Sequence, residues 1–115
     1  MEYKNQIILD GKIQKDVKYF SDIINFNISA VTGIYQVPEG GKRNRYTFIR
    51  SIYEGPIDNK IRTIICQGNF VRIYGSIDSE QYKSQTGKIV YNKILRINKI
   101  KLLKYNEYLD EYEEV

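Results

Sequence analysis

The sequence predicts one all-β domain, in which five strands are joined by turns and one short helix lies between the third strand and the fourth. Three observations support this prediction. The chain has 115 residues, which is enough for one modest hydrophobic core. Apolar and polar residues alternate over several short runs, as they do in half-buried strands. One further stretch repeats isoleucine at helical spacing, with Pro56 before it and Gly68 after it.

The first two strands are expected at residues 5–17 and 22–32. Gly11 interrupts the first run and indicates a bulge or a bend in the middle of that strand. The second run alternates strictly, with Phe26 and Ile28 on its apolar face. We therefore assign Phe26 and Ile28 to the core of the domain.

The third strand is expected at residues 46–53. A loop precedes it at residues 36–44, where proline and two glycines are followed by basic residues. Because side chains alternate along a strand, Tyr46, Phe48 and Arg50 share one face. A row of two aromatic residues and an arginine is unusual for a surface that meets only water.

A short amphipathic helix follows, because isoleucines recur at positions 57, 61, 64 and 65. The fourth strand is expected at residues 69–77, with Val71 and Ile73 in the core, and the fifth at residues 88–103. Between them lies a loop that contains Tyr82 and ends at Gly87. We interpret Gly75 and Gly87 as backbone devices, a close approach or a turn, because no glycine-rich loop between a strand and a helix accompanies them.

Charge is distributed unevenly along the chain. The net charge is +4, from 18 Lys and Arg against 14 Asp and Glu. Residues 106–115 contain five of the acids and none of the bases, which leaves nine acids and a charge of about +9 on residues 1–105. Such a body attracts polyanions, and the 11 Tyr and four Phe add planes on which bases can stack. A solvated basic surface with no partner is the alternative.

Composition also excludes several kinds of chemistry. The chain has no His and one Cys, so imidazole catalysis, a zinc cage of Cys and His, and an internal disulfide are all excluded. Cys66 is expected to be a buried thiol on the apolar side of the helix. The carboxylates are scattered without a shared motif spacing, so we expect no metal, no cofactor and no catalysis. Residues 1–4 do not open a leader sequence, in which a basic region is followed by an apolar one, and no apolar stretch is long enough to span a bilayer. We therefore expect a cytoplasmic protein.

The predicted order of elements is that of the OB-fold, a five-stranded Greek-key barrel whose second and third strands bind oligonucleotides or oligosaccharides. Residues 5–103 further resemble the bacterial and phage single-stranded DNA-binding protein family. The opening run at residues 5–13 and the stretch Phe26-Asn27-Ile28-Ser29-Ala30 are similar to the family's first two strands. The later matches are Phe48-Ile49-Arg50, where the family usually has Trp-x-Arg, the run from Gly68 to Ile77, and Tyr82 five residues before Gly87.

The resemblance implies which residues contact DNA. Phe48 and Tyr82 would stack on bases, Tyr35 is a candidate for a third stacking aromatic, and Arg50 would contact the backbone or a base. Tyr46 lies in the same row as Phe48. Basic residues on the loops beside this face would meet phosphates, namely Lys42, Arg43, Arg45 and Lys83. For each aromatic residue, a place in the core or in an interface is the alternative.

The chain also departs from the family. Glu54 stands where many cellular members have one more stacking aromatic, and Tyr53 could replace that aromatic only if a bulge changed its facing. The long linker with its terminal Pro-Phe pair is absent. We expect a binding domain at residues 1–105 and a short acidic tail at residues 106–115. The tail could form a short helix that packs on a neighbour, lie in the basic groove, or stay solvated.

The sequence therefore predicts a non-catalytic protein that binds single-stranded DNA during replication, recombination or transfer. Its compactness resembles that of members from phages, plasmids or other mobile elements. An unpaired edge at residues 5–9 favours a homo-oligomer, a tetramer or a dimer, and the tail is a candidate contact for replication or recombination proteins. The alternatives are an OB-fold subunit that binds protein instead, and an RNA-binding protein that uses the same groove.

Overall fold

The computed structural model describes residues 4–115. The first three residues of the segment considered as a leader lie outside the described residues. No helix within residues 4–115 has the length and apolar character needed to span a membrane. The elements, in chain order, are β1 (Ile7–Ile13), β2 (Lys18–Tyr19), β3 (Ile24–Gln36), β4 (Lys42–Tyr53), α1 (Asn59–Ile64), β5 (Phe70–Lys83), β6 (Ile89–Asn106) and β7 (Glu111–Glu114).

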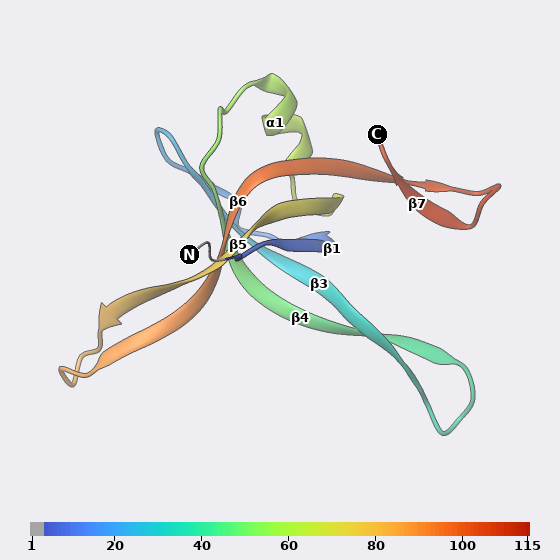
Figure 1. Ribbon diagram of the computed structural model, residues 1–115, viewed down its shortest axis with the longest axis horizontal. Helices are drawn as coiled ribbons and strands as arrows, with labels where there is room; N and C mark the ends of the chain where they lie inside the picture. The colour runs from blue at the N-terminus through green and yellow to red at the C-terminus, as the bar shows by residue number, and fades with distance from the viewer. Residues whose placement is uncertain (1–3) are drawn as a thin grey trace.

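Five long strands form a closed ring in the order β1-β5-β6-β4-β3, and a second pairing between β1 and β3 closes it. All neighbours in the ring are antiparallel except β4 and β6, which run parallel. Strand β1 contributes to both sides of the closure, because Gly11 is paired with Ala30 of β3 and with Val71 of β5. The ring and the helix between β4 and β5 (Figure 1) confirm the predicted five-stranded OB-fold barrel.

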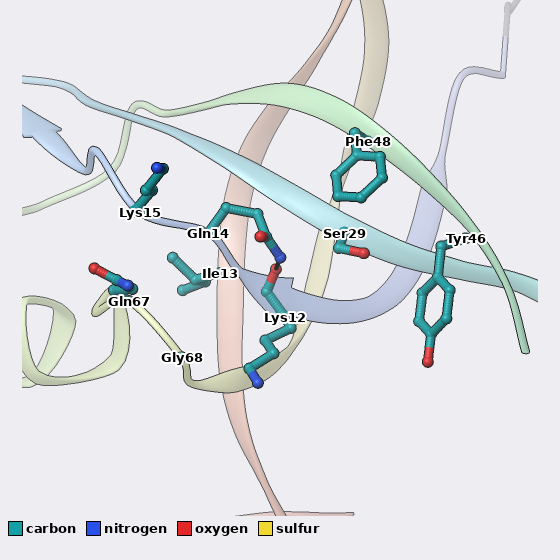
Figure 2. Close-up of a pocket in the computed structure, with 9 residues that line it drawn as sticks. All are labelled: Lys12, Ile13, Gln14, Lys15, Ser29, Tyr46, Phe48, Gln67 and Gly68. Atoms are coloured by element: carbon teal, nitrogen blue, oxygen red, sulfur yellow. Dashed lines mark hydrogen bonds between the residues drawn. The ribbon is translucent and has the colours of Figure 1, made fainter.

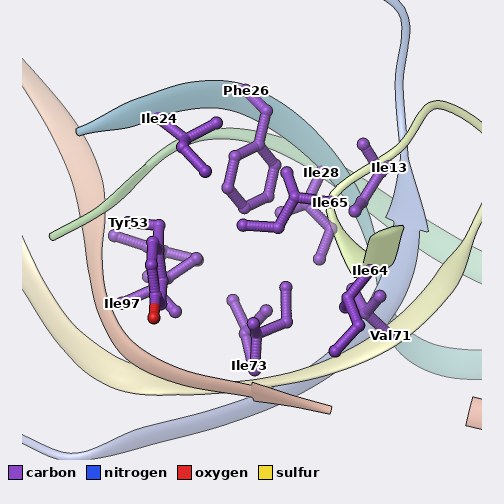
Figure 3. Packing of buried hydrophobic residues seen from close by; sticks show 12 residues of the cluster. Ile13, Ile24, Phe26, Ile28, Tyr53, Ile64, Ile65, Val71, Ile73 and Ile97 are labelled. Carbon is purple, nitrogen blue, oxygen red and sulfur yellow. The ribbon is translucent and has the colours of Figure 1, made fainter. Parts of the chain in front are cut away.

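The core fills the inside of this ring. Phe26 and Ile28 from β3 and Val71 and Ile73 from β5 are buried in one apolar cluster, as predicted (Figure 3). Helix α1 covers one end of the cluster and adds isoleucines from its last turn. The Asp58 side chain caps this helix by accepting a hydrogen bond of 2.8 Å from the backbone amide of Ile61. The amphipathic helix was therefore predicted correctly, although it is short.

Two glycines allow the close backbone approach and the turn that the sequence indicated. A Cβ atom on Gly75 would lie 2.0 Å from the carbonyl oxygen of Arg96 on β6, so only glycine allows this close approach. The pairing register of β5 and β6 shifts at this point. Gly87 adopts φ +85° in the turn between β5 and β6. Both interpretations are confirmed.

Two hairpins extend much further than predicted. The segment between β3 and β4 spans only residues 37–41, and the one between β5 and β6 only residues 84–88. Figure 1 shows the two hairpins leaving the barrel as arms in different directions. An arm that leaves the barrel exposes both of its faces, so its sequence loses the alternation that marks a half-buried strand. Composition alone then wrongly suggested long loops.

Cys66 is exposed, which contradicts the predicted buried thiol. The helix ends at Ile64, and Ile65 at its C-terminus leaves the helical conformation with ψ 74°. The chain therefore turns before Cys66, whose Sγ donates a 3.0 Å hydrogen bond to the carbonyl oxygen of Arg62. The prediction placed Cys66 on the helix, but the helix ends two residues before it.

The acidic tail forms part of a hairpin and not the short helix that was one of its predicted alternatives. Strand β7 pairs with the end of β6, in the register Leu103 to Glu114. The centres of the Tyr112 and Phe70 rings are 4.5 Å apart, and Glu114 accepts a hydrogen bond from the hydroxyl of Tyr74. That hydrogen bond is the main reason why the pKa of the Glu114 carboxyl is lowered. A boundary after residue 105 would cut β6 near its end, and the division into domain and tail stays a prediction.

Candidate nucleic-acid interface

The outer face of β3 and β4 carries the row of side chains that the sequence placed on one face. Phe48 is paired with Ser29, and Arg50 with Asn27, and paired residues of antiparallel strands share a face. The alternate residues of β4, such as Tyr53, point into the core. Phe48 is 72% exposed and Tyr46 is 53% exposed. The barrel thus presents two aromatic rings to solvent side by side along one strand.

An open groove of about 640 Å³ lies against these rings. Figure 2 shows Tyr46 and Phe48 on β4, with Lys12 at the end of β1 and Lys15 in the segment that follows. The groove therefore combines flat apolar surfaces with two ammonium groups. This combination suits a ligand that has planar rings and an anionic backbone.

Sequence reasoning missed the side of the groove opposite β4. Besides the two lysines, Gln14 and Gln67 line it, and none of these four residues was predicted to contact a ligand. The available signal was the spacing of lysines at positions 12, 15 and 18, at the end of the first strand and just after it. In an OB-fold the segment between the first two long strands flanks the binding face. These lysines could therefore have been predicted as contacts to the ligand.

Arg50 links the row on β4 to the arm formed by β5 and β6. Its guanidinium forms an ion pair with the Glu80 carboxylate of β5. Arg50 is paired with Ile94 of β6, and Ile94 with Asp78 of β5, so Glu80 and Tyr82 belong by register to the same outer face. Tyr82 is half-exposed further along the arm. Its ring is accessible, as the stacking prediction requires, whereas Lys83 falls on the opposite face of the arm.

The predicted residues near the other arm's tip are divided between two faces. Arg45 and Arg43 are paired with Gly33 and Tyr35, so by register they lie on the face opposite Tyr46. The Arg45 guanidinium sits 5.7 Å from the centre of the Tyr35 ring, within the range of a cation–π contact. Lys42 is exposed at the start of β4. The structure therefore does not bring Tyr35, Arg43 and Arg45 together with Phe48 on one flat surface.

Glu54, at the position where the resemblance led us to look for one more stacking aromatic, takes part in an ion pair. Its carboxylate pairs with Arg96, whose Nε also donates a 2.5 Å hydrogen bond to Asp78. The hydrogen bond from Arg96 lowers the pKa of the Asp78 carboxyl. The condition for Tyr53 to replace the missing aromatic is not met, because no bulge in the described residues changes its facing: Tyr53 is buried, and its hydroxyl donates to the carbonyl oxygen of Pro56.

Solved structures show which known proteins share this architecture. No family model and no curated protein matches the sequence. The structure superposes on a Plasmodium falciparum SSB solved in complex with ssDNA, with a TM-score of 0.70 and 14% identity, covering 90% of this chain and 98% of that one. A small single-stranded DNA-binding protein from Streptomyces coelicolor matches with a TM-score of 0.59 and 10% identity over 84% and 92% of the two chains.

A mitochondrial single-stranded DNA-binding protein from S. cerevisiae matches as well, with a TM-score of 0.57 and 15% identity over 90% of this chain and 98% of that one. This chain has the fold of single-stranded DNA-binding proteins. The likeness runs along nearly the whole of both chains, so the structural neighbours agree with the resemblance drawn from the sequence motifs.

In the fold of single-stranded DNA-binding proteins, β3 and β4 correspond to strands 2 and 3 of the OB-fold. The outer face of these two strands is the one that binds oligonucleotides or oligosaccharides in that fold. The groove beside Phe48 lies on this face. Within residues 4–115, no group of three or more Cys, Asp or Glu side chains is placed to hold a metal ion.

Proposed function

We propose that the protein binds single-stranded DNA without catalysing a reaction on it. The observation that carries this proposal is the exposed Phe48 ring in a lysine-bordered groove, on the binding face of an OB-fold. Every base has a π-face, so stacking on Phe48, Tyr46 and Tyr82 gives affinity with little sequence preference. A duplex keeps its bases stacked inside and offers no such faces.

Basic residues on the barrel and on both arms supply the electrostatic part of binding. Lys12 and Lys15 border the groove itself. Lys42, Arg43, Arg45 and Lys83 extend the positive charge along the arms, where a strand that leaves the groove would pass. Each phosphate that a lysine or arginine neutralises releases counterions, so binding weakens steeply as salt rises.

The proposal extends to assembly and to the cellular role. Residues 7–10 of β1 are paired with β5 only, and Ile8 on this segment is exposed, so a second copy of the chain could pair with the free edge. We therefore propose a homo-oligomer, a dimer or a tetramer. It would cover single strands in the cytoplasm during replication, recombination or transfer, in a phage, plasmid or other mobile element, with replication or recombination proteins contacting the acidic tail.

A second candidate function is a subunit that binds protein. The observation that favours it is the tip of the β6–β7 hairpin, where Tyr108 is 99% exposed and Leu109 is also exposed. Solvent-facing apolar side chains on a projecting tip suit a partner's pocket. Co-purification of one stoichiometric partner, together with no affinity for single strands, would support this function over the first.

The test is a titration followed by fluorescence anisotropy, with a labelled poly-dT oligomer, a matched duplex and a matched RNA. We expect the poly-dT oligomer to bind more tightly than the duplex at low and at moderate salt, with affinity falling as salt rises. Stronger binding of the RNA in direct competition would instead identify RNA as the ligand. Equal binding of single strand and duplex would contradict stacking as the basis of the interaction.

Replacing Glu80 by Gln is expected to strengthen binding. The carboxylate of Glu80 neutralises Arg50 on the binding face, so its removal frees the guanidinium for phosphate and removes repulsion. We expect the affinity for poly-dT to rise by roughly two- to fivefold at low salt, because an exposed ion pair is worth at most about 1 kcal/mol. Anisotropy titration measures the change. The control is Glu113→Gln on β7, which should leave the affinity for poly-dT unchanged. If Glu80→Gln binds poly-dT more weakly than the wild type, the assigned role of Arg50 is contradicted.

A further inference from the structure

A second groove, also of about 640 Å³, lies on the same outer face beyond Arg50. Strand β2 and the residues after it form one side of this groove, and β3 and β4 form the other. Phe20 lines it and is 53% exposed. Arg50 is the one residue of this groove that was predicted from the sequence to contact DNA.

The pairing register places this groove in line with the first one. Asn25 is paired with Lys18 on one side and with Ile52 on the other, and Asn27 is paired with Arg50. Along β3, Asn25, Asn27 and Ser29 are therefore successive residues of one face, and Ser29 lines the first groove. The two grooves therefore follow one another on the same face of β3, with Arg50 lining the second, and we call the two together the track.

The position of Phe20 is fixed by its neighbours. The hydroxyl of Tyr19 donates a 3.2 Å hydrogen bond to the carbonyl oxygen of Ile65, which holds β2 against the end of α1. The backbone amide of Phe20 donates to the carbonyl oxygen of Ile23 in a tight turn. The ring of Phe20 thus belongs to an anchored segment and is exposed in spite of this, which is the arrangement of a preformed stacking platform.

Asn25, which lines this groove, carries a hydrogen-bond acceptor that is unpaired but buried. The Oδ1 atom of Asn25 is buried and has no hydrogen-bond partner among the described residues. Such atoms are rare in folded proteins, because nearly all buried polar groups are paired. Each of the four bases carries N–H donors on its Watson–Crick edge, which are free in a single strand. Lys18 provides a cation at the same groove, and among residues 4–115 Asp16 is the one acid that lines it.

We propose that this groove is a second nucleotide subsite, which continues the single-stranded DNA path past Arg50. One base stacks on Phe20 and Lys18 contacts a phosphate, while the buried Asn25 amide turns towards the groove to accept a hydrogen bond from a base edge. This inference rests on the proposed function, because it extends the same strand from the Phe48 groove. It sets the direction in which the DNA crosses the barrel, along β3 towards β2.

The test uses poly-dT oligomers of increasing length, from about 5 to about 15 nucleotides, within the range of OB-fold site sizes. For Phe20→Ala we expect unchanged affinity for the shortest oligomer, which the Phe48 groove can hold, and a loss of roughly fivefold or more for the longer ones. Phe48→Ala should lose affinity at every length. Tyr108→Ala, which removes an exposed ring far from the track, is the matched control and should bind as the wild type does.

A second readout keeps the test decisive if Phe20→Ala folds poorly. The chain has no Trp, so Phe20→Trp introduces a single reporter that can still stack. We expect its fluorescence to be quenched by long oligomers and not by the shortest one, with no quenching in Tyr108→Trp. If the wild type binds no oligomer, the proposed function fails. If the wild type binds but Phe20→Ala behaves like it and Phe20→Trp is not quenched, only the second subsite is overturned.

Discussion

Replacing Phe48 by Ala is expected to weaken the binding of single-stranded DNA by roughly 5- to 150-fold. This range corresponds to the loss of about 1–3 kcal/mol when one base loses its stacking platform. Phe48 is 72% exposed and belongs to no core cluster, so the substitution should leave the free energy of unfolding nearly unchanged. Anisotropy titration with poly-dT gives the affinity, and thermal unfolding confirms that the variant is folded.

Two further variants show whether the ring itself matters at this position. Phe48→Trp keeps a flat π-face and should restore or increase the affinity. Phe48→Leu keeps an apolar side chain without a π-face and should bind nearly as weakly as Phe48→Ala. Wild-type affinity in Phe48→Ala, measured on a folded protein, would contradict the stacking role of the groove.

Replacing Gly75 by Ala is expected to cause the largest loss of stability among single methyl additions to the barrel. The new Cβ would lie 2.0 Å from a backbone oxygen of β6, so the two strands must separate where their register shifts. Overpacking of this kind costs about 1–3 kcal/mol and occasionally more. The clash is with backbone and not with a mobile side chain, so we expect at least about 2 kcal/mol and a fall in Tm of roughly 10 °C.

Gly33→Ala is the matched control for this prediction. Gly33 also lies in a long strand, β3, but an added Cβ there would contact nothing within 4 Å. Its effect on the free energy of unfolding should stay within about 1 kcal/mol. Equal Tm values for Gly75→Ala and Gly33→Ala would mean that the close approach at Gly75 does not constrain the barrel.

The sequence predicted the barrel because each of its five strands buries one face. Phe26 and Ile28 alternate with polar residues on β3, and both lie in the core. The helix was recognised because Ile61, Ile64 and Ile65 follow helical spacing and pack on the same cluster. The row of Tyr46, Phe48 and Arg50 could be predicted in the same way, since alternation on β4 places them together on the face away from the core.

The parts that could not be predicted lack a buried face. The ends of the two arms expose both sides of each strand, so no period marks them and they were taken for loops. Strand β7 is exposed throughout and depends on contacts that are distant in sequence, such as Tyr112 with Phe70. Each groove combines residues from separate strands, and only the register of the folded sheet shows that Asn25 and Ser29, which line one groove each, lie on the same face of β3.

The central claim, that the outer face of β3 and β4 binds single-stranded DNA, is tested most directly by an NMR footprint. The protein is labelled with ¹⁵N and its amide resonances are followed as poly-dT is added. We expect the largest shifts at Lys12–Lys15, Tyr46–Arg50 and Asn25–Ser29, with little change in β7. Shifts concentrated on β7 and the β6–β7 tip, or no shifts at saturating poly-dT, would contradict the claim.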